Sequence, residues 1–234
     1  MKFKDLIASG DPAVVKVTLT AGACLAVYLN HGGAGFGAGI LEVAPDEPSA
    51  VIWHFLAAFA VLGLVPALAW MFLIRQPLAA LGITVGDLAY GLRFVGLTLP
   101  LLVVPIVLIG AQMSDIRTEY PLARGIGVGA ADLVFYETMY LLYYAGYELF
   151  FRGLLTLGLA PRIGAFPAVS LSMLVSTAIH LGKPGGEVWG AVLVGFVFGW
   201  LALRTRSVLW PFILHAFIGV LTDVFVVMGP GSLR

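Results

Sequence analysis

Long apolar runs bounded by charged residues, proline or glycine are the feature of this sequence that most constrains its fold. Crossing the roughly 30 Å hydrocarbon core of a bilayer takes about 20 apolar residues in a helix. Seven runs come near this length, at residues 13–29, 50–74, 93–113, 132–159, 165–181, 188–203 and 207–228. They predict an all-α, polytopic bundle of about seven transmembrane helices. The mildly amphipathic stretch 78–92 predicts a short interfacial helix between two of them.

The composition supports a membrane protein and excludes a nucleic-acid partner. Hydrophobic residues make up 60% of the 234 residues and charged residues only 11%, against about a quarter in soluble domains. The formal net charge is zero, and no basic stripe of the kind that binds nucleic acid is present. The single cysteine, Cys24, lies in an apolar run and cannot form an internal disulfide, so we expect it in the core. Without a repeat or a composition break, we expect one membrane-embedded domain over residues 1–234.

Glu148 and Arg152 are the strongest signal of a functional site. They are four positions apart in an apolar, aromatic run, and residues at that spacing share one face of a helix. A charged side chain inside the hydrocarbon region is costly alone, and it normally faces a partner or a water-filled interior. Function is therefore the default interpretation of the pair, with a purely structural ion pair as the alternative.

Two histidines on other predicted helices, His180 and His215, complete a hydrolytic set. A carboxylate with two imidazoles can activate water as a general base beside oxyanion-stabilising groups, or all three can bind a metal. No H-E-x-x-H pattern is present, so a zinc-dependent mechanism stays an open alternative that no motif indicates, and no metal ligands are assigned. Serine catalysis is weaker, because Ser176 lies one turn before His180 and no G-x-S-x-G elbow occurs.

Three short motifs in order resemble a known family. E-L-F-F-R at 148–152, A-I-H at 178–180 and L-H at 214–215 are similar to the motifs of the CPBP (CAAX protease and bacteriocin-processing, or Abi) intramembrane endopeptidases. The usual motifs of that family are E-E-x-x-x-R, F-x-x-x-H and H-x-x-x-N/D on successive membrane helices. The resemblance covers about residues 132–223 and implies that the catalytic helices lie within about 132–228.

The sequence departs from these motifs at three positions. Tyr147 takes the place of the first glutamate, Ser176 that of the phenylalanine, and Gly219 that of the final Asn or Asp. The aromatic-Glu version of the first motif is similar to a bacterial branch of the family. That likeness implies a multi-pass protein of the bacterial cytoplasmic (inner) membrane.

The resemblance implies a glutamic-type peptidase. In it, Glu148 deprotonates a water that attacks the scissile carbonyl, His180 and His215 stabilise the oxyanion or move protons, and Arg152 fixes Glu148. The expected substrate is a membrane-anchored protein or peptide, cut near a membrane-associated or C-terminal segment within the lipid bilayer, with no cofactor required. Residues expected to bind substrate or support the site are Tyr144, Tyr147, Ser176, Lys183, Glu187 and Asp223.

A second hypothesis uses the same polar cluster without catalysis. The chain would then be a membrane scaffold or transporter that binds a partner or an ion, although no repeat symmetry of the kind common in transporters is visible. Lys183 and Glu187 could equally organise the turn in which they lie. Convergence of Glu148, His180 and His215 within a few Å would favour hydrolysis.

Overall fold

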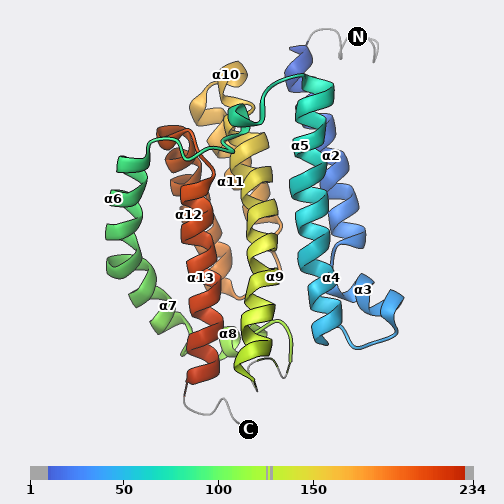
Figure 1. Cartoon of the computed structure of the whole chain (residues 1–234), viewed down its shortest axis with the longest axis vertical. Helices are drawn as coiled ribbons and strands as arrows, with labels where there is room; N and C mark the ends of the chain where they lie inside the picture. Colours follow the sequence, from blue (N-terminus) through green and yellow to red (C-terminus); the bar gives the residue numbers. More distant parts are fainter. Residues whose placement is uncertain (1–9, 125, 127–128, 230–234) are drawn as a thin grey trace.

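The computed structural model describes residues 10–124, 126 and 129–229, which form helices and no strand (Figure 1). Several of the helices change between α and π pitch without a break. The first half contains α2 Pro12–His31, α3 Ala34–Leu41, the continuous helix α4 Pro48–Ala58, η1 Phe59–Leu64, α5 Val65–Ala69 and η2 Trp70–Ile74, and the single turn η3 Leu78–Leu81. Next come α6 Leu88–Thr98, η4 Leu99–Val103, α7 Val104–Gly110 and the short α8 Ser114–Glu119.

The second half follows the same pattern. It contains α9 Ala130–Glu148, which continues as the π-helical η5 Leu149–Leu157, then α10 Ala160–Ile163, α11 Ala165–Ala178, α12 Gly185–Thr205 and α13 Leu209–Met228. Figure 1 shows α9 running between the α4–α5 helix and α13, so the middle of the bundle is built around α9.

The prediction of an all-α membrane bundle is confirmed. Within the described residues, five helices are long and apolar enough to cross a membrane: Pro12–His31, Pro48–Ile74, Leu88–Gly110, Gly185–Thr205 and Leu209–Met228. In the apolar 18-residue stretch of each of these helices, no more than 33% is buried inside the protein, so most of the helix surface can face lipid. The predicted total of about seven spans stays a prediction, because α11 has only 14 residues and α9 with η5 is not among the five.

The expectation of an interfacial helix over 78–92 is wrong. A single 3-10 turn ends at Gly82, whose φ of 81° lies in the left-handed region, and Gly86 has a φ of 62°. Glycine adopts that region without the steric cost of a side chain, so the two glycines break the helical pattern. Asp87 then caps α6, because its carboxylate accepts a hydrogen bond from the amide of Tyr90 (3.0 Å). The third long helix therefore begins at Leu88, five residues earlier than the sequence predicted.

The Gly86–Asp87 loop packs against the turn between α12 and α13. A side chain at Gly86 would place its Cβ 2.0 Å from the carbonyl oxygen of Thr205, so only glycine fits there. The amide of Asp87 donates to the same carbonyl (2.9 Å), and the Asp87 carboxylate pairs with Arg204 (2.9 Å). The amide of Tyr90 and then the Arg204 guanidinium hold the pKa of Asp87 below its ordinary 3.8. This loop fixes the start of α13.

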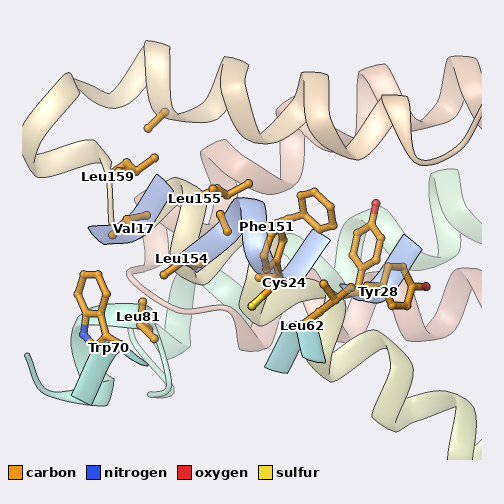
Figure 2. Close-up of a cluster of buried hydrophobic side chains, with 14 of the residues drawn as sticks. Val17, Cys24, Tyr28, Leu62, Trp70, Leu81, Phe151, Leu154, Leu155 and Leu159 are labelled. Atoms are coloured by element: carbon orange, nitrogen blue, oxygen red, sulfur yellow. The ribbon is translucent and has the colours of Figure 1, made fainter. Parts of the chain in front are cut away.

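A buried apolar cluster joins the first and second halves of the chain (Figure 2). Side chains from α2, η1, η2 and η3 meet those of η5 in it, and Cys24 lies there, as predicted, as a buried free cysteine. Phe151, Leu154 and Leu155 supply the contribution of η5. Seven of the nine residues of η5 are buried, so packing holds this segment within the bundle.

Gly146 sets the distance between α9 and the α4–η1 helix. A Cβ there would lie 2.7 Å from the carbonyl oxygen of Ala58 and 2.7 Å from the Cα of Phe59. Small residues at such crossings let membrane helices approach closely, and van der Waals packing then holds them. Because Gly146 is two residues before Glu148, this crossing fixes the depth at which the glutamate lies.

Candidate active site

Glu148 is fully buried where α9 passes into η5, and it contacts two charged or chargeable groups. Its Oε1 lies 2.6 Å from His215 Nδ1, and its Oε2 lies 3.3 Å from Arg152 Nε. An ionised carboxylate only accepts hydrogen bonds, so the imidazole N–H donates to it. The predicted Glu148–Arg152 pair is therefore in place, and α13 brings His215 to the same carboxylate.

The π-helical pitch of η5 is supported by two hydroxyls. Thr156 Oγ1 and Ser172 Oγ both donate to the carbonyl oxygen of Phe151, at 2.9 and 2.8 Å. All three residues are buried, and Ser172 comes from α11. Segments of π-helix occur frequently at functional sites. Here the segment carries Arg152, and the Ser172 hydrogen bond anchors it to α11.

Arg152 is enclosed by aromatic rings. Its Cζ lies 5.7 Å from the ring centroid of Tyr147, 5.9 Å from that of Phe151 and 5.4 Å from that of Phe198. Cations within about 6 Å of a ring face are stabilised by its quadrupole. Even so, Arg152 Nε and Nη1 and Glu148 Oε2 have no hydrogen-bond partner of good geometry among the described residues. Buried polar atoms of this kind normally bind a partner or a water molecule.

Of Glu148 and His215, only His215 has a side chain that is partly exposed at the protein surface. Its side chain is 17% exposed, whereas that of Glu148 is 0% exposed. The imidazole is packed by Tyr144, Tyr147 and Phe198, with ring centroids 4.6, 5.1 and 6.0 Å away. A substrate approaching the pair would therefore meet His215 before the carboxylate.

Tyr144 fills the space left by Gly219. A Cβ on Gly219 would lie 1.8 Å from the Tyr144 hydroxyl oxygen and 2.5 Å from its Cζ. The position at which the resembled motif has Asn or Asp is thus occupied in space by a tyrosine from α9. Because the same ring packs on His215, Tyr144 supports the imidazole directly.

His180 joins the group through Tyr147. It lies in the turn after α11, and its Nδ1 is 2.7 Å from the carbonyl oxygen of Ser176. The ring of Tyr147 packs edge-on against His180, with 6.1 Å between centroids, and its hydroxyl is 2.6 Å from Ser176 Oγ. The structure thus brings Glu148, Arg152 and His215 into direct contact, with His180 on the other side of a shared tyrosine ring.

The comparison with protein families falls on the elements that carry these contacts. Residues 130–221 match the family model described as "Rce1-like: Type II CAAX prenyl endopeptidase Rce1-like". Over these residues, the chain is similar to the type II CAAX prenyl endopeptidases that this model describes. The match runs from the start of α9 into α13 and includes Glu148, Arg152, His180 and His215. No curated protein and no solved structure matches the chain.

The matched family is one of endopeptidases, as its description says. The match confirms the resemblance found in the sequence, over nearly the same residues. The apolar helices agree with an integral, multi-pass membrane protein. The roles of individual residues stay predictions.

Three of the predicted supporting residues make their contacts away from Glu148. Lys183 forms an ion pair with Glu119, and the Tyr120 hydroxyl donates to Glu187 (2.9 Å). These bonds tie the turn before α12 and the first turn of α12 to the end of α8. Asp223 is fully buried and lies near the Tyr136 hydroxyl.

Sequence reasoning missed Thr156, Ser172 and Gly219 as contributors to the site. The first two are small hydroxyl residues in apolar helices, and nothing in their spacing shows that both bind one carbonyl. Gly219 was read only as a departure from a motif. The cue for it lay in the tyrosine-rich sequence of α9, because a large side chain on one helix is often matched by a small one on its neighbour.

Proposed function

We propose that this protein is a CAAX-type protease that hydrolyses a peptide bond near a membrane-associated or C-terminal segment of its substrate, using a water deprotonated by Glu148. The observation that carries the proposal is the 2.6 Å contact of Glu148 Oε1 with His215 Nδ1, inside the bundle and beside Arg152. A fully buried carboxylate held by an imidazole and a guanidinium is costly to keep for stability alone.

The proposed mechanism begins at Glu148 Oε2. A water bound between this oxygen and the unpaired N–H groups of Arg152 would satisfy three buried polar atoms at once. Glu148 takes the proton as the water oxygen attacks the scissile carbonyl carbon. Because His180 and His215 keep Nδ1–H for their own partners, they stabilise the negative oxygen that forms as imidazolium ions, whose Nε2–H groups can donate to it. The C–N bond then breaks as the leaving nitrogen takes the proton held by Glu148. Arg152 keeps the carboxylate in place throughout.

We propose further that this hydrolysis needs no metal, so no step is routed through one. Among the described residues, no three His, Cys, Asp or Glu side chains come together in a way that could hold a metal ion. His180 and His215 instead use Nδ1 for a backbone carbonyl and for Glu148. Full activity after incubation with a chelator is the expected result. Loss of activity that zinc restores would overturn this part of the proposal.

The test uses purified protein in lipid nanodiscs and an internally quenched peptide that ends in a farnesylated CAAX sequence. An unlipidated apolar peptide with the same scissile region forms the second arm. The expected result is cleavage that Glu148→Gln abolishes, with the site of the cut read by mass spectrometry. Full activity of Glu148→Gln would remove Glu148 from the mechanism, and binding of either peptide without cleavage would support a scaffold or transporter instead.

The proposed setting is the cytoplasmic membrane of a bacterium, and the proposed substrate is itself membrane-anchored. The large apolar surface of the spanning helices supports the membrane setting, because such surface is stable only in lipid. Comparing the C-terminal peptides of membrane proteins from cells with and without the gene would identify the substrate. Identical peptides in both cell types would contradict the proposal.

A further inference from the structure

Tyr147 touches every residue to which the proposed function assigns a role. It precedes Glu148 in the chain, and the Arg152 guanidinium carbon lies 5.7 Å from its ring centroid. One side of the ring packs edge-on against His215 (5.1 Å, 86°) and another against His180 (6.1 Å, 81°). The two imidazoles come from different parts of the chain, and this ring is the body that both of them contact.

Ser176 fixes the far end of that tyrosine. Its Oγ is 2.6 Å from the Tyr147 hydroxyl, with Tyr147 1% and Ser176 2% exposed. A buried hydroxyl without a partner is destabilising, so each of the two residues depends on the other. The carbonyl oxygen of Ser176 lies 2.7 Å from His180 Nδ1. One residue thus holds the tyrosine through its side chain and the histidine through its backbone.

These contacts decide how the imidazoles are presented. A carbonyl oxygen and an ionised carboxylate accept hydrogen bonds but cannot donate them. His180 therefore carries its proton on Nδ1 toward Ser176, and His215 carries its own on Nδ1 toward Glu148. In the neutral state both rings turn Nε2 away from these partners as a free acceptor. Both rings also pack edge-on against Tyr147, so their relative orientation depends on this shared contact.

We propose that Tyr147 and Ser176 act as one positioning unit that sets the relative orientation of His180 and His215. They are also two of the three positions at which the sequence departs from the resembled motifs, and the structure shows the two replacements hydrogen-bonded to each other. The catalytic consequence rests on the proposed function, whereas the orientation of the rings does not. Tyr147 is a positioning residue in this scheme, because it acts through the imidazoles.

The orientation is tested without a substrate by NMR on protein with 13C-labelled histidine rings. The chain has only four histidines, so each signal is assigned by a single substitution. Tyr147→Phe and Ser176→Ala each remove one hydroxyl of the pair and should shift or broaden the signals of His180 and His215, while those of His31 and His54 stay in place. Ser176→Thr keeps a hydroxyl and should restore the wild-type positions.

The matched control is Tyr136→Phe, on the same helix and equally buried. The Tyr136 hydroxyl makes no hydrogen bond of good geometry among the described residues, so none of the four histidine signals should move. Unchanged His180 and His215 signals in both Tyr147→Phe and Ser176→Ala would overturn the proposal. A change of the two histidine signals in only one of the variants would also overturn it, because loss of either hydroxyl should disrupt a joint unit.

The activity arm uses the same farnesylated CAAX peptide. Misplacing a catalytic group by about 1 Å can cost on the order of 100-fold in rate, so kcat should fall about 10- to 100-fold in Tyr147→Phe with little change in KM. The double variant Tyr147→Phe/Ser176→Ala should lose no more than either single one, and fully multiplied losses would refute a joint role. If wild-type protein cleaves nothing while both imidazole signals still move, the proposed function fails and the positioning unit stands.

Discussion

Replacing Glu148 by glutamine tests the energetics of the site as well as its chemistry. The substitution keeps the shape but removes the negative charge that lies 3.3 Å from Arg152 Nε, where the side chains are 0% and 2% exposed. Breaking a buried ion pair by removing one partner typically costs about 3–5 kcal/mol, because the remaining charge stays buried without compensation. In a chain of this size each kcal/mol shifts the melting temperature by roughly 2–4 °C, so we expect a drop of about 6–20 °C.

The compensated variant separates stability from catalysis. Glu148→Gln/Arg152→Met removes both charges and retains similar volume, so most of the lost melting temperature should return while peptide cleavage stays absent. Melting is followed in detergent by the fluorescence of the five tryptophans. Arg152→Met alone should cost less than Glu148→Gln, because His215 still contacts the carboxylate. A Glu148→Gln protein that melts within about 1 °C of wild type would refute this account of the pair.

Three smaller perturbations test the packing and the loop around the site. Gly219→Ala should destabilise the fold by about 1–3 kcal/mol and impair cleavage, because its Cβ would meet the Tyr144 hydroxyl 1.8 Å away. Gly190→Ala, with open space around it, should leave the melting temperature unchanged, and equal effects of the two variants would contradict the close packing of Tyr144 on Gly219. Gly86→Ala should lower the melting temperature strongly, since it combines a φ of 62° with a 2.0 Å clash, and a stable variant would exclude the left-handed turn. Asp87→Asn should melt below wild type at pH 7, and the difference should vanish as the pH falls below 3.8, because a carboxyl with a lowered pKa stabilises the fold only while it is ionised. A difference in melting temperature that does not change with pH would contradict this.

Helical periodicity was enough to predict the contact between Glu148 and Arg152. The two lie on one helix, and the i, i+4 rule fixes their relation whatever the rest of the chain does. The contact of His215 with the same carboxylate depends on the depth of α13, which the 82–87 loop and the Gly146 crossing set through contacts between distant segments. No local pattern encodes that depth.

The hydrogen bond between Tyr147 and Ser176 was beyond the reach of the same reasoning. Each residue alone looked like a loss of a family motif, and only their spatial pairing shows that one departure is matched to the other. The prediction of an interfacial helix over 78–92 was wrong for a different reason. The apolar residues of this stretch have a helical spacing, but the left-handed backbone at Gly82 and Gly86 depends on contacts with distant residues. The Thr205 carbonyl accepts from the amide of Asp87, and the amide of Val208 donates to the carbonyl of Gly82.

The π-helical η5 has a consequence for how the length of this protein can vary. A π-helical turn has i→i+5 hydrogen bonds and holds one residue more than an α-helical turn, so losing one residue from 149–157 is absorbed by a return to α pitch. Gaining one residue has no such outlet and would rotate everything beyond it by about 100° relative to Glu148, which would take Leu154 and Leu155 out of their buried cluster. Exposed turns can absorb an insertion, but in η5 an added residue changes which side chains face inward.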